Sequence, residues 1–279
     1  MSAPELVEIR RYPVKSMLGE TLQSVFLGEK GIPGDRAWAT RDEKRGGIRG
    51  AKQIPQLMRL QARHMDDGAP LITAPDGESC AASAQDVNQW LSVKLDHPVT
   101  LWPILPADNV EHYRRGAPDN KDFEQELRTV FGRLPGEPLP DLSEFAELLE
   151  FDSPPGTYFD AFPLMLMSRQ SLATLTAAAP NSKFDVRRFR PNLLLDFPEG
   201  TGAYPEQALV GKVLRIGDAV LEVVSTCPRC SMTTHATADL PRDTDIMRHL
   251  VQQTGGNLGI YARVVEPGHA QAGQILETV

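Results

Sequence analysis

Short segments with alternating apolar and polar positions, or with clustered β-branched and aromatic residues, dominate the first hundred residues. Such segments, bounded by turn-forming residues, are typical of β-strands. The predicted strands cover residues 6–12, 22–27, 37–40, 60–64, 71–73 and 99–102. A helix interrupts them, because Ser83 and Asp86 form a capping signal and apolar residues then recur at helical spacing to Leu95.

Between residues 106 and 155 this alternation gives way to charged runs and to a proline-rich stretch at 134–140. Proline cannot donate to a β-ladder, so the region is predicted to be a linker or a long surface excursion. Short helices are expected within it at 123–131 and 142–149. Strands are predicted to resume at residues 164–167, 192–195, 213–216, 220–224 and 260–264, with helices after Ser168 and at 243–252.

Many strands and few helices, without a regular βαβ alternation, predict a mainly β (α+β) fold in which helices decorate two β-barrel-like domains. The change of pattern divides the chain into three parts. These are an N-terminal β-barrel domain over residues 1–105, a linker or helical excursion over 106–155, and a C-terminal β-barrel domain over 156–279.

The composition argues against several classes of protein. Apolar residues make up 41% and charged residues 24% of the chain, as in an ordinary globular protein. A net charge of −8 argues against a general nucleic-acid binder, which needs a basic face. We expect no membrane association, since no apolar run reaches the length of a membrane span and Met1 is not followed by a basic signal. Three cysteines suit a reducing compartment, so we expect a cytoplasmic protein.

A Cys-x-x-Cys motif at residues 227–230 directly follows an apolar run. Cys230 at a strand end, with the cation of Arg229 beside it, is placed to act as a thiolate ligand or nucleophile. Structural zinc normally requires four ligands. The only further cysteine, Cys80, lies in another predicted domain, and His235 adds one ligand at most. The sequence therefore disfavours a zinc site.

Two other interpretations of the motif were compared. A thioredoxin-like dithiol would open a helix in a βαβ unit, whereas the β-branched Thr233 and Thr234 follow here. Two buried cysteines that act as small apolar residues remain an alternative. The favoured interpretation is that the Cys230 thiolate works on a metal or on a sulfur atom.

Three turns at strand ends carry basic side chains. Lys15 and Ser16 lie in a turn after the first strand, where free backbone N–H groups suit a phosphate. Arg36 lies at the start of a predicted strand. A run of arginines that ends at Arg190 precedes Asn192, whose amide can both donate and accept. In an acidic chain, three such turns indicate one pocket for a phosphate-bearing ligand.

Taken in order, these motifs resemble the MOSC family, named for the C-terminal domain of molybdenum-cofactor sulfurase. The resemblance is in particular to the branch with an N-terminal MOSC-associated β-barrel, which includes the mitochondrial amidoxime-reducing component. It extends over nearly the whole chain. The segments that carry it are residues 12–16, 34–36, 52–57, 188–192, 227–230 with the following Thr233 and Thr234, and 259–264.

The resemblance implies a cofactor and its site. In the family, the second cysteine of the motif ligates a molybdenum held by a pterin dithiolene, so Cys230, and not Cys227, resembles the metal ligand. The basic turn adds Asn192 as a further candidate. Residues that match the family's contacts to the pterin and its phosphate are Lys15, Ser16, Arg36, Arg190, Pro228 and Arg229. A soft thiolate suits a metal–sulfur centre, and arginine forks suit phosphate.

The resemblance also implies a reaction. We expect a molybdenum-cofactor oxidoreductase that reduces N-hydroxylated, or other N- or S-oxygenated, small molecules. The chain has no four-cysteine set for an iron–sulfur cluster, so a separate ferredoxin- or cytochrome-like protein is expected to donate the electrons. Candidates for the acid that protonates the leaving group are Asp35, Asp160 and His235.

Some features leave alternatives open. Where amidoxime-reducing members place a Thr-Ser pair, this chain has Asp160-Ala161-Phe162 before Pro163, which removes a hydroxyl contact to the cofactor. The Gly-rich, basic loop at 45–50 either lines the rim of the site or is a mobile surface loop. Two alternative functions remain: a sulfur-carrier or sulfur-transfer protein that uses Cys230, and a non-catalytic carrier of the cofactor.

Overall fold

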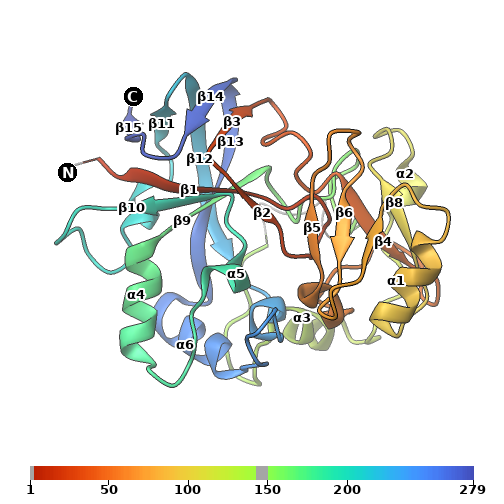
Figure 1. Cartoon of the computed structure of the whole chain (residues 1–279). Coiled ribbons are helices and arrows are strands. Elements are labelled where there is room, and N and C mark those ends of the chain that lie inside the picture. The colour runs from red at the N-terminus through yellow and green to blue at the C-terminus, as the bar shows by residue number, and fades with distance from the viewer. Residues whose placement is uncertain (1–2, 143–149) are drawn as a thin grey trace.

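The computed structural model describes residues 3–142 and 150–279, and strands predominate in it (Figure 1). The strands are β1 (Glu5–Arg11), β2 (Glu20–Leu22), β3 (Ser24–Leu27), β4 (Trp38–Asp42), β5 (Gln61–Arg63), β6 (Leu71–Thr73), β7 (Ser79–Ala81), β8 (Val99–Pro103), β9 (Leu164–Ser168), β10 (Leu193–Asp196), β11 (Val213–Ile216), β12 (Ala219–Pro228), β13 (Asn257–Glu266), β14 (Gly268–Gln271) and β15 (Glu277–Thr278). The α-helices are α1 (Val87–Leu95), α2 (Val110–Tyr113), α3 (Phe123–Phe131), α4 (Arg169–Ala178), α5 (Val186–Phe189) and α6 (Asp245–Thr254). Short 3₁₀ helices are η1 (Pro55–Arg59), η3 (Pro205–Leu209) and η4 (Ser231–Thr234). The expected mainly β fold is confirmed.

One large curled sheet forms the left half of the molecule in Figure 1. Its strand order is β15-β11-β12-β13-β9-β10-β1-β2, and its pairs are antiparallel except β9 with β10. A two-stranded sheet pairs β14 with β3. Because β1 pairs with β10 and β3 with β14, strands from the N-terminal part complete sheets built by the C-terminal part.

β9 shows why a continuous apolar run forms a central strand here. Successive side chains of a strand point to opposite faces of the sheet. Leu164 and Leu166 pack into one core of the large sheet, whereas Met165 and Met167 pack into a second core that includes residues of α4 and α6. Figure 1 shows α4 and α6 below the large sheet. Since both faces of β9 are buried, its sequence has no polar alternation.

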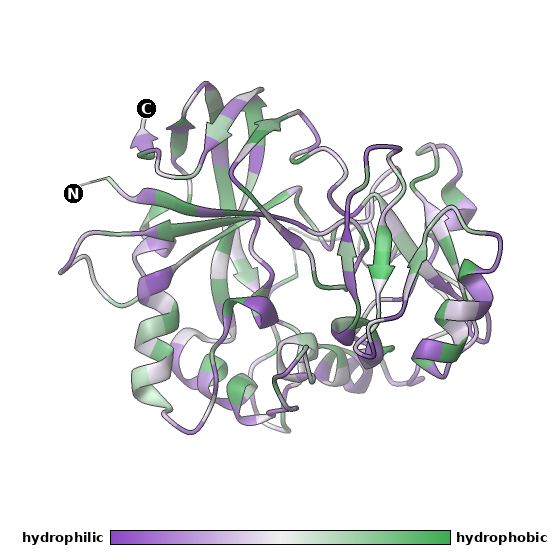
Figure 2. Cartoon of the chain, in the orientation of Figure 1, coloured by the Kyte–Doolittle hydropathy of each residue, from purple (hydrophilic) through white to green (hydrophobic). Residues whose placement is uncertain are grey.

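Smaller sheets form the right half of the molecule in Figure 1. They are β5-β6-β7 and β4-β8, with α1 packed beside them. Their side chains build a separate core that includes Ile72, Leu91 and Leu101. In Figure 2, hydrophobic segments concentrate in the strands of both halves, and hydrophilic segments occupy many of the connecting loops. None of the helices in the described ranges combines the length and the apolar character of a membrane span.

Most predicted elements are present, and α3, β6 and β11 have the predicted bounds. Ser168 caps α4 as expected, since its Oγ accepts a hydrogen bond from the Ser171 N–H at 3.1 Å. The predicted strand at 22–27 is divided at Gln23 into β2 and β3, which pair with different strands. The predicted helix at 142–149 lies, apart from its first residue, outside the described residues. Short elements such as β7, α2 and α5 were not predicted.

Candidate cofactor site

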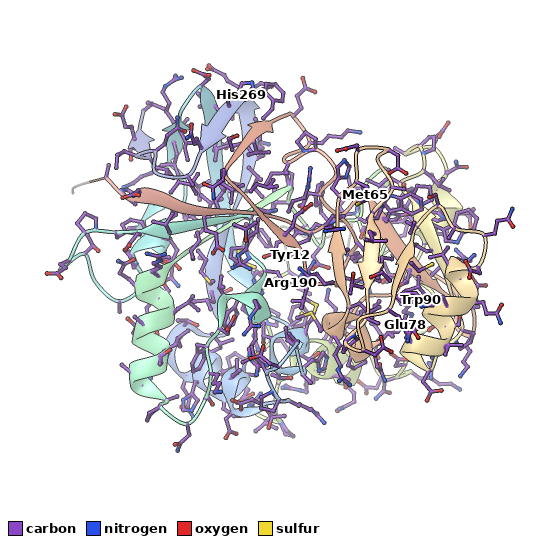
Figure 3. All side chains as sticks on the ribbon, in the orientation of Figure 1. Tyr12, Met65, Glu78, Trp90, Arg190 and His269 are labelled. Atoms are coloured by element: carbon purple, nitrogen blue, oxygen red, sulfur yellow. The ribbon has the colours of Figure 1, made fainter. Side chains whose placement is uncertain are left out.

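A pocket opens where segments of the large sheet meet segments of the smaller sheets. Figure 3 shows Tyr12 and Arg190 at this junction, in the middle of the molecule. All residues proposed from the sequence line this one pocket: Lys15, Ser16, Arg36, Arg190, Asn192, Pro228, Arg229 and Cys230. The sequence did not single out Lys52 for the site, although it lies in one of the motifs and also lines the pocket. The structure thus brings distant turns together, while their roles stay a prediction.

The Cys230 thiol lies where the chain leaves β12 and begins η4. The backbone fixes this turn, because the Arg229 N–H donates to the Gly256 carbonyl at 2.8 Å. The Thr233 hydroxyl donates to the Cys230 carbonyl at 3.1 Å. Cys230 is half-buried, whereas Cys227 is buried. The turn therefore presents the Cys230 sulfur to the pocket while neighbouring backbone groups are satisfied.

The Arg229 guanidinium bonds to the first cysteine of the motif. It was expected to stabilise the Cys230 thiolate, but its Nη1 donates to the sulfur of Cys227 at 3.1 Å and its Nη2 to the Phe189 carbonyl at 2.7 Å. The guanidinium also lies over the Phe189 ring, 5.6 Å from its centroid. Arg229 thus anchors the motif to the end of α5 through its first cysteine, a contact that adjacency in the sequence does not reveal.

Two guanidinium groups stack on the ring of Tyr12. The Arg190 carbon Cζ lies 4.2 Å and the Arg36 carbon Cζ 4.7 Å from the ring centroid. Both arginines have left-handed backbone, with φ of 59° and 46°. The Tyr12 hydroxyl donates to the Pro191 carbonyl at 3.0 Å, which fixes the ring. Cation–π contact with a fixed ring holds both arginines at the pocket wall.

The Asp35 carboxylate supports this arrangement through three hydrogen bonds. It accepts hydrogen bonds from the Tyr12 N–H at 2.6 Å, from the Asn192 amide at 3.0 Å and from Arg36. The Asn192 oxygen in turn accepts from Arg36 at 3.0 Å and from the Met165 N–H at 3.2 Å. Both Asp35 and Asn192 are therefore engaged by the protein, and they orient Arg36.

Arg190 is the basic side chain that most clearly lacks a polar partner. It is only 4% exposed, and its Nη1 has no hydrogen-bond partner among the described residues. Burial, together with the charge of Arg36, lowers the pKa of Arg190 to about 10, so the group is still charged at neutral pH. A buried, incompletely paired charge costs free energy, which an anionic ligand would recover.

Asp160 forms an ionised bridge between two lysines of the pocket. Its Oδ1 lies 3.0 Å from the Lys15 ammonium and 3.4 Å from the Lys52 ammonium. Lys15 also donates to the Ser153 hydroxyl at 3.1 Å and to the Tyr158 carbonyl at 2.9 Å. Desolvation alone would raise the pKa of Asp160, but the two ammonium groups outweigh it and hold the pKa well below its usual range. Asp160 is therefore deprotonated at neutral pH.

Ser16 fixes the turn opposite Asp160 and keeps a free donor. Its Oγ accepts a hydrogen bond from the Ala51 N–H at 2.9 Å, and its backbone is left-handed with φ of 69°. A Cβ at Gly50 would lie 2.5 Å from this oxygen, so only glycine allows the approach. Because the bond uses Ser16 as an acceptor, its hydroxyl hydrogen can still donate to a ligand.

The three arginines of the run 187–190 have different roles. Arg187 is paired on the surface with Asp185 at 2.8 Å and with Asp239 at 2.6 Å. Arg188 is 1% exposed and is absent from the pocket lining. It donates to backbone carbonyls, among them those of His235 at 2.8 Å and Pro241 at 2.7 Å. The sequence placed all three in one basic turn, and of them only Arg190 lines the pocket.

The variant Arg188→Met is expected to lower the free energy of unfolding by about 3 kcal/mol, because it leaves several buried carbonyls without a donor. Chemical denaturation of the metal-free protein measures this. A change within about 0.5 kcal/mol, typical of a surface position, would show that the guanidinium does not stabilise the fold.

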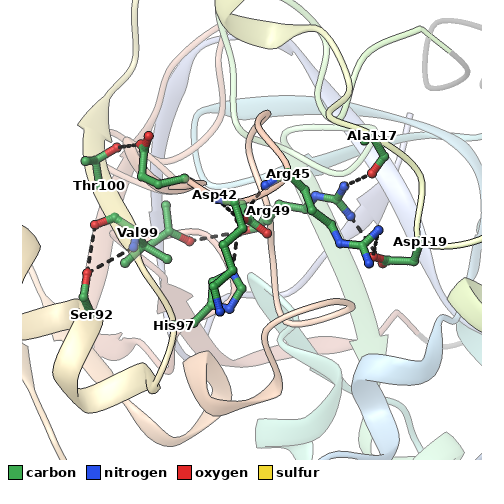
Figure 4. Close-up of polar contacts among 12 residues, drawn as sticks. Asp42, Arg45, Arg49, Ser92, His97, Val99, Thr100, Ala117 and Asp119 are labelled. Atoms are coloured by element: carbon green, nitrogen blue, oxygen red, sulfur yellow. Dashed lines mark hydrogen bonds and ion pairs between the residues drawn. The ribbon is translucent and has the colours of Figure 1, made fainter.

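The Gly-rich loop 45–50 belongs to the rim through its backbone, while its arginines are engaged elsewhere. Figure 4 shows Arg45 and Arg49 directed at Asp119, 2.9 Å and 3.3 Å from its carboxylate, and Arg49 also donates to the Ala117 carbonyl. Ile48 and Gly50 line a side pocket next to the main one. These arginines therefore hold residues 117–119 against the loop.

His235 is a poor candidate for the acid. It does not line the main pocket, and burial, together with Arg242, lowers its pKa and keeps it neutral. In the described ranges, no group of three or more His, Cys, Asp or Glu side chains is arranged to hold a metal ion.

A thiol thus lies beside a cationic pocket, at the junction of two mainly β halves. Comparison with known families agrees with the class that the motifs suggested. The MOSC domain matches residues 154–277, and the MOSC N-terminal beta barrel domain matches residues 3–100. The chain belongs to the MOSC family and carries both of its domains, which confirms the resemblance.

Two curated relatives match most of this chain. The molybdenum cofactor sulfurase of Drosophila grimshawi is 25% identical over 261 residues, which cover 92% of this chain and 32% of the sulfurase. The mitochondrial amidoxime reducing component 2 of Bos taurus is 24% identical over 242 residues, 81% of this chain and 65% of that protein. The chain thus spans less than two thirds of the length of either relative.

Solved structures also resemble the chain. The YUAD protein from Bacillus subtilis matches with a TM-score of 0.45 and 10% identity, covering 100% of this chain and 96% of its own. YiiM from Escherichia coli matches with a TM-score of 0.32 and 23% identity, covering 42% of this chain and 54% of its own.

Proposed function

We propose that this protein binds a molybdenum–pterin cofactor and reduces N-hydroxylated, or other N- or S-oxygenated, small molecules with electrons from a separate donor protein. The observation that carries the proposal is that the half-buried Cys230 lines the same pocket as the incompletely paired Arg190 guanidinium. The family and the similarity to the bovine mitochondrial amidoxime reducing component 2 support it.

The residues of the pocket fit such a cofactor chemically. Lys15, Arg36, Lys52, Arg190 and Arg229 face a single carboxylate, Asp160, among the described lining residues. This surplus of positive charge suits a phosphate-bearing anion, in a chain whose net charge is −8. The thiolate of Cys230 is a soft ligand of the kind that a metal–sulfur centre prefers.

The chain's own residues have distinct tasks in this proposal. When bound, the cofactor supplies the electron-transfer chemistry and the protein supplies binding, orientation and electrostatics. Arg190 and the Ser16 hydroxyl donate to the phosphate, and Asp35 and Asn192 keep Arg36 pointed at the pocket. Phe162 and Tyr261, whose rings lie 5.5 Å apart, form an aromatic wall that limits water near the Cys230 sulfur.

The electron donor is part of the proposal. With three cysteines, the chain cannot assemble a four-cysteine iron–sulfur cluster of its own. A ferredoxin- or cytochrome-like protein is therefore proposed to supply the electrons, and a reduced viologen can replace it in an assay.

The test is expression in two hosts, one competent in pterin-cofactor synthesis and one blocked in it. Protein from the competent host is expected to carry stoichiometric molybdenum and to reduce an aryl amidoxime with reduced viologen, and protein from the blocked host neither. Elemental analysis of both preparations checks the metal. Equally metal-free preparations would overturn the proposal.

Sulfur transfer by Cys230 is a second candidate function, which the match to a molybdenum cofactor sulfurase favours. In that case the thiolate would carry a persulfide, and no molybdenum would be needed. Sulfane sulfur that appears on Cys230 after sulfur loading and is absent in Cys230→Ser would support this function. Stoichiometric molybdenum without any labile sulfur would exclude it.

A further inference from the structure

A smaller side pocket lies next to the main pocket. The two share lining residues, including Lys15, Lys52 and Asp160. The side pocket has a volume of about 30 Å³. A space of this size and polarity has room for ordered water, since about 10–15 Å³ suffices for one molecule. The floor of the side pocket includes Asp152, a carboxyl group that the sequence analysis did not consider.

Asp152 carries an oxygen without a partner. Its backbone N–H is held by the Tyr113 carbonyl at 3.2 Å, and its Oδ1 lies 3.4 Å from Arg115. The other oxygen, Oδ2, is buried and has no hydrogen-bond partner among the described residues. A Cβ at Gly47 would lie 3.1 Å from this oxygen, so the Gly-rich loop covers it closely. A buried oxygen without a partner suits a protonated carboxyl group, because an ionised group would lack compensation there.

The charges around Asp152 do not keep it ionised as they do Asp160. Burial raises the pKa of Asp152, and this outweighs the opposing charges of Arg115, Arg49, Lys15 and Lys52. Asp160 also lines the side pocket and has its pKa held low by the two lysines. Two carboxyl groups at one site thus have pKa values shifted in opposite directions, the arrangement that assigns one of them as an acid.

We propose that Asp152 is the proton donor for cleavage of the substrate N–O bond, delivering its proton through the side pocket to the departing oxygen. This rests on the proposed reductase function. The overall step, R–NHOH + 2 e⁻ + 2 H⁺ → R–NH₂ + H₂O, breaks the N–O bond and releases its oxygen as water. The electrons come from the donor protein. Asp152 supplies one proton and solvent the other, and solvent water then reprotonates Asp152.

The other acids considered are unsuited to this task. Asp160 is held in its ionised form by the two lysines, and Asp35 accepts hydrogen bonds from Tyr12, Asn192 and Arg36 and does not line either pocket. His235 lines neither pocket. Among these carboxyl and imidazole groups, Asp152 combines an oxygen that has no hydrogen-bond partner in the described residues with a place in the lining of the side pocket.

The test compares wild type and Asp152→Asn, each loaded with cofactor, in reduction of an aryl amidoxime by reduced viologen across pH. The variant is expected to lose about 10²-fold in kcat, at the lower end of the contribution of general acids, with KM and molybdenum content unchanged. The wild-type kcat should fall as pH rises through the pKa of Asp152, and this fall should be absent in the variant. The control is Asp76→Asn, a surface carboxylate paired with Lys94 far from both pockets, expected to behave as wild type.

A second measurement uses the metal-free proteins. Because the folded-state pKa of Asp152 is raised, its ionised form costs stability above that pKa, and protonation removes the cost as pH falls. Asp152→Asn should therefore be more stable than wild type near neutral pH, and the difference should shrink towards acid pH. An equal kcat and an unchanged pH profile in an active Asp152→Asn would overturn the proton-donor role while leaving the reductase standing. A wild-type protein that holds molybdenum but reduces no amidoxime would overturn both, whatever the stability data show.

Discussion

Cys230→Ser, purified from a host that makes the pterin cofactor, is expected to bind molybdenum at least roughly 100-fold more weakly than wild type. A loss of affinity of this size is the largest that is common when only an outer-sphere partner of a metal is removed. The reason is that an alcohol is a much poorer ligand than a soft thiolate for a metal–sulfur centre. Reductase activity should fall with the metal. Elemental analysis and the viologen-linked assay measure the two quantities on the same preparation.

Cys80→Ser is the matched control, since Cys80 is also a free cysteine but belongs to the core of the smaller sheets and does not line the pocket. It should keep its molybdenum. If Cys227→Ser loses the metal and Cys230→Ser keeps it, the metal is bound by the Cys227 thiol and not by Cys230. Retention in both variants would show that no cysteine of the motif ligates it.

Arg190→Met is expected to weaken cofactor binding by about 4 kcal/mol, or roughly 10³-fold, within the range for truncating one partner of a buried charge pair. Methionine keeps much of the side-chain volume but removes the group that faces the ligand's negative charge. The measurement is the molybdenum and pterin content after dialysis of the loaded protein at increasing dilution.

The same variant should not destabilise the metal-free protein. The folded-state pKa of Arg190, about 10, is below the ordinary pKa of arginine. The charged side chain therefore lowers the free energy of unfolding, and it does so fully at every pH below about 10. Arg190→Met in its metal-free form should therefore unfold at the same or a higher denaturant concentration, in contrast to Arg188→Met. Arg187→Met, from the same short run, is the control. It should change neither the affinity for the cofactor nor the denaturant concentration at which the metal-free protein unfolds. A metal-free Arg190→Met that unfolds more easily would assign Arg190 to the fold and not to the ligand.

Much of the pocket could be predicted because its residues lie at strand ends. Lys15 follows β1, Arg36 precedes β4 and Cys230 follows β12, so each sits in a turn where a local motif is visible in the sequence. The order of these motifs identified the family. Their meeting at one pocket requires the pairing of β1 with β10, which joins distant segments and which no local pattern encodes.

Other features of the site depend on the direction of a side chain and not on its position in the sequence. Arg188 and Arg190 are two residues apart, yet the left-handed backbone of Arg190 at the end of α5 turns it to the pocket, while Arg188 points into the protein. A run of arginines gives no sign of this difference. Similarly, Arg229 adjoins Cys230 in sequence but bonds to Cys227.

Asp152 could not have been found from the sequence. It lies in an irregular, proline-rich segment without a periodic pattern, and its environment is built by Gly47, Arg115 and Lys15 from other parts of the chain. Burial and lack of a partner are properties of the assembled structure. A carboxylate flanked by ordinary residues has no recognisable signature in the sequence alone.

The pairing of strands across the two halves affects how fragments of this protein behave. Expressed alone, a fragment that starts at residue 154 would lack β1 and β3, leaving β10 and β14 with open backbone edges that invite intermolecular strand addition and aggregation. Proteolytic nicking between residues 106 and 155 would instead yield two polypeptides that remain hydrogen-bonded to each other through both ladders.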